Sequence, residues 1–107
     1  MDFLLAVYIP NSAVETVKKA LFAAGAGAYE NYDQCCWQTQ GQGQFRPLDK
    51  ANPTIGTQGK LEIVDEIKLE MICSKANFNN VISALKKAHP YEEPAYYVLA
   101  LQPSNET

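Results

Sequence analysis

The feature that most constrains the fold of this chain is the alternation of residue types over positions 61–73. The odd positions are apolar with one exception: Leu61, Ile63, Asp65, Ile67, Leu69, Met71 and Cys73. The even positions carry charge at Glu62, Glu66, Lys68 and Glu70. Because successive side chains of a strand point to opposite faces, the pattern predicts one long strand with a buried face and a polar face. Asp65 interrupts the apolar face, so we expect it at a bulge or beside a lysine.

The remaining segments supply two helices and three further strands. Residues 3–9 are apolar and aromatic and end at Pro10, which predicts a buried strand. Apolar residues recur at helical spacing over 13–24 and again from 78 to 85, and the run 95–101 predicts the last strand. A second strand is predicted over 29–40, with packing residues at Tyr32, Cys35 and Trp37.

Signals for helix ends support both helical segments. Ser12 and Glu15 fit a capping box at the start of the first helix, and Gly25 suits a left-handed residue at its end. Asn77 is a plausible cap of the second helix, which Pro90 must end because proline disfavours helical geometry at His89.

The order β-α-β-β-α-β predicts an α+β fold of the ferredoxin-like type. Both helices should lie on one face of a four-stranded antiparallel sheet, since each crossover is right-handed. Glycine, proline and amide residues fill about 38–59, which predicts a long loop or an extended β-ribbon of functional importance. The chain reads as a single domain, 1–107, with a polar tail over 102–107.

Charge and hydropathy exclude two classes of partner. Twelve acidic and nine basic residues give a formal net charge of −3, whereas binding to phosphate backbones needs a basic face. No apolar run approaches the roughly 20 residues that span a bilayer. Residues 1–7 lack the basic start and the cleavage site of a secretion signal, so we expect a cytoplasmic protein without nucleic-acid or membrane partners.

The three cysteines, Cys35, Cys36 and Cys73, are expected to be reduced. Their number is odd and their spacing irregular. Adjacent Cys35 and Cys36 would point to opposite faces of a strand and make poor partners in one zinc site. We interpret the cysteines as small apolar residues that fill the core.

The segment His89-Pro90-Tyr91-Glu92-Glu93-Pro94 is the first candidate site. His89, Glu92 and Glu93 could bind a divalent metal such as zinc or copper, with further ligands from the ribbon or another subunit. Alternatively the segment is a corner that ends a helix, with His89 hydrogen-bonded and the glutamates solvated or paired with lysine.

Arg46, the only arginine, is the second candidate. Its guanidinium could hold a phosphate or carboxylate, and the backbone at Gly43 could approach the same anion. The alternative is a salt bridge to Glu62, Glu66 or Glu93, inside the subunit or between subunits. Aromatic residues could add a face for a ligand or a partner, or belong to the core: Phe45, Tyr91, Trp37, Tyr96 and Tyr97.

No catalytic residue is predicted. His89 is the only visible base for any serine or cysteine, and sequence alone does not place them together. We therefore expect a protein that is not an enzyme.

Several blocks resemble the inserted domain of the YqfO-like proteins of the NGG-interacting-factor family. They include Ala20–Gly27, Asn31–Cys35, Gly41–Leu48, Ala51–Pro53 and Ala88–Tyr96, and they span nearly the whole chain in order. The resemblance implies a fold similar to CutA and to the PII signalling proteins, and a homotrimer, because those families form trimers. Two positions depart from the pattern: Glu30 and Lys50 stand where the family commonly has glycine, so the turns there could differ.

The larger members of this family also have a metallohydrolase-like domain with a dinuclear site of histidines and carboxylates. This chain has a single histidine, so the hydrolase activity does not carry over. We consider three hypotheses. The first is a trimeric regulator or sensor that binds a metal or a small anion at subunit clefts, with a possible protein partner at the ribbon. The second is an accessory domain that acts on a separate metallohydrolase, and the third is a structural stress-tolerance trimer without a specific ligand.

Overall fold

The computed structural model describes residues 2–103, and its elements follow the predicted order. The strands and helices are β1 (Asp2–Pro10), α1 (Val14–Ala23), β2 (Trp37–Phe45), β3 (Glu62–Ser74), α2 (Phe78–Ala88) and β4 (Tyr96–Ala100). Short 3₁₀ turns, Asn11–Ala13 and Lys75–Asn77, precede the two helices. The end of the predicted polar tail, 104–107, lies outside the described residues.

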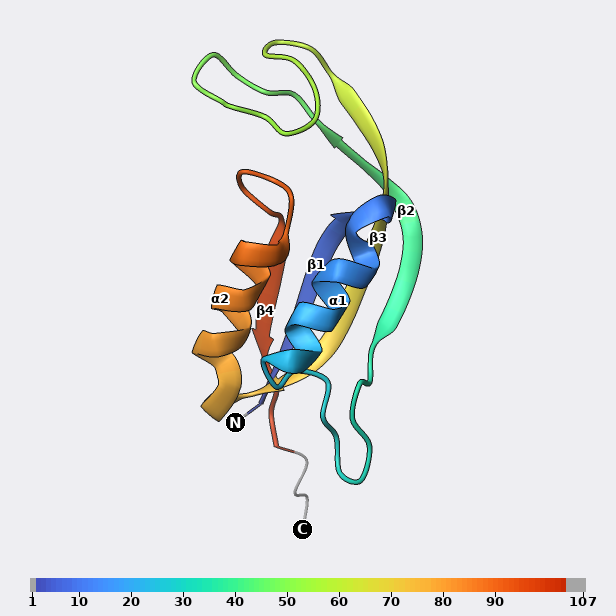
Figure 1. Ribbon diagram of the computed structural model, residues 1–107, viewed down its shortest axis with the longest axis vertical. Coiled ribbons are helices and arrows are strands. Elements are labelled where there is room, and N and C mark those ends of the chain that lie inside the picture. The colour runs from blue at the N-terminus through green and yellow to red at the C-terminus, as the bar shows by residue number, and fades with distance from the viewer. Residues whose placement is uncertain (1, 104–107) are drawn as a thin grey trace.

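The ferredoxin-like prediction is confirmed. The sheet has the order β2-β3-β1-β4, and every neighbouring pair is antiparallel. Both helices cover the same face of this sheet (Figure 1). The pairing runs without a break past Asp65, which lies opposite Gln42 and accepts a hydrogen bond of 3.3 Å from its Nε2. The expected bulge or lysine neighbour at Asp65 was therefore wrong, because a polar residue of the edge strand satisfies this carboxylate.

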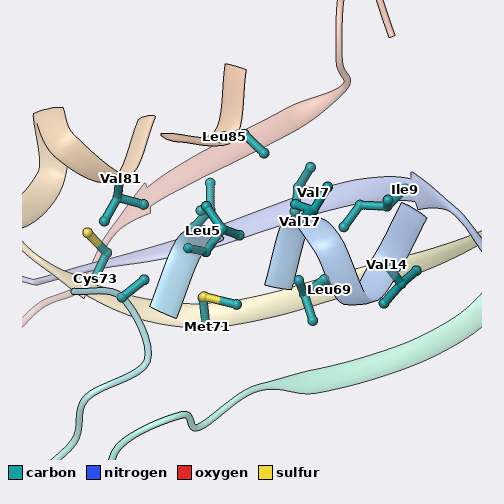
Figure 2. Packing of buried hydrophobic residues seen from close by; sticks show 12 residues of the cluster. Leu5, Val7, Ile9, Val14, Val17, Leu69, Met71, Cys73, Val81 and Leu85 are labelled. Atoms are coloured by element: carbon teal, nitrogen blue, oxygen red, sulfur yellow. The ribbon is translucent and has the colours of Figure 1, made fainter. Parts of the chain in front are cut away.

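The core lies between the two helices and the covered face of the sheet (Figure 2). Leu5 pairs with Met71 and Val7 with Leu69, so the apolar positions of the two central strands meet directly. The helices add Val14, Val17, Leu21, Val81 and Leu85. Each fully buried side chain of this size contributes about 1.5–3 kcal/mol. Cys73 is buried here as predicted. Burial raises the pKa of its thiol, and the nearby charge of Asp2 raises it further.

The predicted strand over 29–40 begins too early. Tyr29 and Tyr32 face each other across a tight turn, and β2 starts only at Trp37. Tyr32 and Trp37 are mostly exposed rather than packed. Cys35 and Cys36 precede the strand, one half-buried and one exposed, so only Cys73 of the three is a core residue. Aromatic residues favour strands in general, but here pairing with β3 fixes where the strand begins.

The predicted capping box at Ser12 was wrong, whereas the N-cap position of Asn77 and the helix end at Gly25 are confirmed. Ser12 lies within a 3₁₀ turn and Ala13 is the N-cap of α1. Asn77 is the N-cap of α2, but its side chain forms no capping hydrogen bond. The side chain of Ser74 accepts from the Asn77 amide instead, which caps the short turn. At Gly25 the φ angle is 106°, and the amides that follow α1 return to carbonyls of its last turn.

The two positions that depart from the resembled family behave differently. Glu30 has a φ of 53°, in the left-handed region that glycine adopts without cost, so the tight turn persists with a glutamate in it. Lys50 does not have a positive φ. The turn at Lys50 therefore does not need glycine.

The ribbon predicted over about 38–59 is half strand and half loop. β2 and β3 pair from Trp37–Glu70 to Phe45–Glu62, and residues 46–61 form the loop that joins them. The loop bends back over the segment between α2 and β4 (Figure 1). Among residues 2–103, neither helix is long and apolar enough to cross a membrane.

Candidate functional site

A cleft of about 670 Å³ lies where the end of the ribbon meets the segment after α2. Its walls come from the ribbon (Gln42, Gly43, Gln44, Phe45, Arg46, Pro47, Leu48, Lys50, Ala51, Pro53, Thr54, Ile55), from the sheet (Tyr8, Glu66, Tyr97) and from the segment after α2 (Tyr91, Glu92, Glu93, Ala95). Such a volume is within the range of small-molecule sites.

The structure brings together all four residues predicted to bind a ligand. Gly43, Phe45, Arg46 and Tyr91 line this cleft, although Tyr91 comes from the other end of the chain. The rings of Phe45 and Tyr91 are close, with centroids 6.1 Å apart. The ribbon and the corner after α2, which the sequence marked separately, are therefore two walls of one site.

Two hydrogen bonds hold the ribbon loop over the cleft. The Asn52 amide donates to Glu92 Oε1 at 3.1 Å, and the Thr54 hydroxyl donates to the Pro90 carbonyl at 2.6 Å. Both bonds are exposed to solvent. Bonds of this kind contribute about 1 kcal/mol or less each, so these two bonds hold the loop only weakly in place.

His89 is a corner residue in this structure, as the alternative interpretation described. It is 5 % exposed, ends α2 in extended geometry, and precedes Pro90. Its Nδ1 accepts a hydrogen bond of 3.1 Å from the Tyr91 amide, so the proton is on Nε2, which donates to the Tyr8 carbonyl at 2.7 Å. Burial lowers the pKa of His89, although the Tyr8 carbonyl and Glu66 act in the opposite direction.

The predicted metal ligands do not form a metal centre within one chain. Over residues 2–103 there is no group of three or more His, Cys, Asp or Glu side chains that could hold a metal ion. His89 has both ring nitrogens engaged by the backbone, and Glu92 accepts the Asn52 amide. His89 can bind zinc or copper only by giving up one of these bonds.

Tyr91 joins the corner to the sheet. Its hydroxyl donates to Glu66 Oε2 at 2.8 Å, and its ring lies beside that of His89, with centroids 5.0 Å apart. Burial raises the pKa of the Tyr91 phenol. The hydrogen bond to Glu66 and the negative charge of Glu66 raise it further. The phenol is therefore a hydrogen-bond donor at neutral pH and not a base.

The positive groups of the cleft have no acidic partner among the described residues. Arg46 is exposed. Within residues 2–103 it forms none of the salt bridges to Glu62, Glu66 or Glu93 that the sequence analysis considered, and Lys50 forms no ion pair with any described residue. A free guanidinium offers a planar set of donors to a carboxylate or phosphate. The arrangement thus supports the anion interpretation of Arg46.

The five aromatic residues singled out from the sequence do not share one face. Phe45, Tyr91 and Tyr97 line the cleft, whereas Tyr96 packs against the core. Trp37 lines a second, shallower hollow of about 390 Å³ near Cys35 and Cys36. The single aromatic face was therefore wrong.

Sequence reasoning missed Glu66 as a site residue, because it belongs to the charged set of the alternating strand. It is 8 % exposed, although its set was expected to face solvent. One signal was available: Gly41 and Gly43 share a parity in β2, and glycine within a strand often marks a close approach by a neighbour. A Cβ at Gly43 would overlap the Glu66 carboxylate.

Comparison with solved structures identifies the fold. The fold is that of CutA: the "periplasmic divalent cation tolerance protein CutA" of Archaeoglobus fulgidus superposes with a TM-score of 0.69 over 99% of this chain and 89% of that one, at 17% identity. At this identity the likeness shows the fold alone. No family model matches the chain.

The sequence relatives identify the kind of protein in which this domain occurs. The chain is 37% identical to the Bacillus cereus "protein related to NIF3", with a TM-score of 0.82 over 95% of this chain and 26% of that one. Proteins named "GTP cyclohydrolase 1 type 2 homolog" are 43% identical over 98% of the chain in Halalkalibacterium halodurans and 45% over 92% in Bacillus subtilis.

The predicted resemblance to the NGG-interacting-factor family is thus confirmed for this CutA-like domain. The chain spans only about a quarter of the length of these relatives, 28% and 26% of the two curated sequences.

Proposed function

We propose that this domain is a non-enzymatic regulatory module that binds a small anionic ligand in the cleft between the ribbon and the corner after α2. The observation that carries the proposal is the position of Arg46 and Lys50. Both line a cleft of about 670 Å³, and neither has an acidic partner within residues 2–103. An unpaired guanidinium beside aromatic walls is suited to a carboxylate or phosphate.

The closed ribbon loop supports a regulatory role. Its contacts to the opposite wall are two exposed hydrogen bonds, so a ligand that touches both walls would shift the loop further toward the closed form. Among residues 2–103, no His, Cys or Ser lines the cleft, and the Thr54 hydroxyl is engaged by the Pro90 carbonyl. This supports a binding role over nucleophilic catalysis.

A thermal-shift screen tests the proposal, with phosphate, sulfate, citrate and succinate as anions and Zn²⁺ and Cu²⁺ as metals. Ligand at 100 times its Kd stabilises a fold by about 2.7 kcal/mol, so we expect at least one anion to raise Tm by roughly 10 °C. Arg46→Ala should abolish this rise and leave the unliganded Tm almost unchanged, because Arg46 is exposed and unpaired.

Two other results would replace the proposal. Stabilisation by Zn²⁺ that His89→Ala removes would favour the metal site of His89, Glu92 and Glu93 instead. No shift with any anion or metal, in a protein of high intrinsic Tm, would favour the structural stress-tolerance trimer.

We also propose that the domain assembles as a homotrimer. Three large apolar side chains are exposed on the face of the sheet that no helix covers: Trp37, Tyr97 and Leu99. Clusters of exposed apolar residues commonly mark protein interfaces. The outer strands β2 and β4 each leave one backbone edge open to pairing.

One comparison favours a second function. The matching segment is about a quarter of proteins named GTP cyclohydrolase 1 type 2 homolog, so this kind of domain occurs beside other protein segments. We propose as the alternative that it acts as an accessory to a metallohydrolase. Co-purification of a metallohydrolase with the tagged domain, reproduced with the two purified proteins, would support it, and failure of the purified pair to associate would exclude it.

A further inference from the structure

The most unusual group in the molecule is the carboxylate of Glu66. It is 8 % exposed, yet within residues 2–103 no lysine, arginine or histidine nitrogen forms an ion pair with it. Transfer of an ionised carboxylate out of water is costly, and buried charges in proteins are normally paired. Within residues 2–103 the Glu66 carboxylate therefore lacks a positive partner, and the Tyr91 hydroxyl is its only described side-chain donor.

The surroundings of Glu66 leave one of its oxygens available to the cleft. Oε2 accepts the Tyr91 hydroxyl at 2.8 Å. Oε1 lies over Gly43, where a Cβ would overlap it, and no described donor bonds to it. Both Gly43 and Glu66 line the cleft, so a ligand there can reach this oxygen.

Arg46 brings positive charge to the same cleft. Arg46 follows Phe45, which pairs with Glu62, whereas Glu66 pairs with Gly41 further along the ribbon. The Glu66 carboxylate lies over Gly43, and Arg46 follows Gly43 by three residue steps, which correspond to roughly 10 Å of strand. The two charged side chains thus start from backbone positions several residues apart, and the rings of Tyr8, Phe45 and Tyr97 lie among the other walls of the cleft.

We propose that the ligand of this cleft is dipolar: a small molecule with a primary ammonium at one end, which Glu66 binds, and a carboxylate or phosphate several bonds away, which Arg46 binds. The inference rests on the proposed function, because it takes the cleft as a ligand site. It adds the second recognition group and the separation of the charges. A ligand that lacks the ammonium forgoes a charged hydrogen bond to Glu66, which then keeps only the Tyr91 hydroxyl as its donor.

Titration calorimetry with a series of ω-amino acids tests the inference: glycine, 4-aminobutanoate, 6-aminohexanoate and 8-aminooctanoate, with hexanoate and hexylamine as matched controls. We expect 6-aminohexanoate to bind more tightly than either control by about tenfold or more, and glycine to bind weakly because it cannot reach both charges. Equal binding of hexanoate and 6-aminohexanoate would overturn the inference and leave the anion site of the proposed function intact.

Variants assign the two ends of the ligand. Glu66→Gln keeps an oxygen for the Tyr91 hydroxyl but removes the charge, so the preference for 6-aminohexanoate over hexanoate should disappear. Arg46→Gln should remove the preference for 6-aminohexanoate over hexylamine. Glu15→Gln is the matched control, an exposed glutamate of α1 that does not line the cleft, and it should change neither preference.

The two proposals fail in different ways. If the wild-type protein binds none of the amino acids but is stabilised by phosphate, sulfate, citrate or succinate, the dipolar ligand is wrong and the anion site remains. If it responds to none of these compounds, both are wrong. Because the comparison of ligands uses only the wild-type protein, it holds even if Glu66→Gln fails to fold.

Discussion

Glycine at position 43 leaves room for the carboxylate of its neighbour Glu66. Gly43→Ala places a methyl group where that carboxylate lies, so the acid must move, and we expect its bond to Tyr91 to be lost. We expect Gly43→Ala to lower the free energy of unfolding by about 1–3 kcal/mol, as measured by urea denaturation.

Gly41→Ala is the matched control for this substitution. Gly41 lies in the same strand and shares a face with Gly43, but open space surrounds its Cβ position. Removing the excess backbone freedom of a strand glycine should leave stability unchanged or raise it by about 0.5–1 kcal/mol. The same change in stability for both variants would show that the Glu66 carboxylate moves aside freely.

The single histidine makes stability depend on pH in a defined window. Burial lowers the pKa of His89 in the folded state below its ordinary value of 6.5, so the unfolded chain binds the proton more readily. Stability from His89 is complete above pH 6.5 and falls as the pH drops below it, by at most about 1.4 kcal/mol per pH unit.

Urea denaturation between pH 7.5 and 5.5 measures this effect. His89→Gln should remove the dependence, because the chain has no other histidine to titrate there. Stability that rises on acidification would show that the Tyr8 carbonyl and Glu66 outweigh burial at this corner.

At the scale of elements, the ribbon loop depends on a side chain from the far end of the sequence. Glu92→Ala removes the acceptor of the Asn52 amide, so this amide should exchange its hydrogen faster by a factor of about 5–10, while the core strands β1 and β3 stay protected. Hydrogen exchange followed by NMR measures each amide separately.

Glu93→Ala provides the comparison for the ribbon loop. Glu93 is the adjacent carboxylate in the same cleft, and no described hydrogen bond uses its side chain. It should leave the exchange of the Asn52 amide unchanged. If both variants accelerate exchange equally, the negative charge of the segment holds the loop rather than this bond.

The success of sequence reasoning differed between elements for physical reasons. Patterns that repeat along one element identified β3, both helices and the ribbon, because periodicity directly reports which face is buried. The start of β2 and the capping box at Ser12 were wrong, since pairing with β3 and the 3₁₀ turn before α1 override local preference. The cleft was only half predicted: Arg46 and Tyr91 carry visible chemistry, whereas the burial of Glu66 follows from contacts between distant segments.

At the scale of the whole molecule, the ribbon makes the chain elongated. Its radius of gyration is 15.2 Å, above the roughly 13 Å of a compact domain of this length. For the proposed homotrimer, small-angle scattering at micromolar concentration should give a radius of roughly 20 Å. A radius that stays near 15 Å would contradict the assembly.

A substitution on the open face of the sheet separates assembly from folding. Leu99 is 58 % exposed in the single chain, so Leu99→Asp should leave the fold intact. In an assembly through this face it should shift the protein toward monomers. A trimer unaffected by Leu99→Asp would place the interface elsewhere, for example along the ribbon.

The strand order also determines when each strand can pair during synthesis on the ribosome. β1 is made first, but it lies inside the sheet, between β3 and the short last strand β4. Until residue 74 has left the exit tunnel β1 has no partner, and until residue 100 emerges one of its edges stays bare. Between the synthesis of β1 and that of β4, the apolar strand β1 therefore has at least one unpaired edge, which is a condition that favours aggregation during folding.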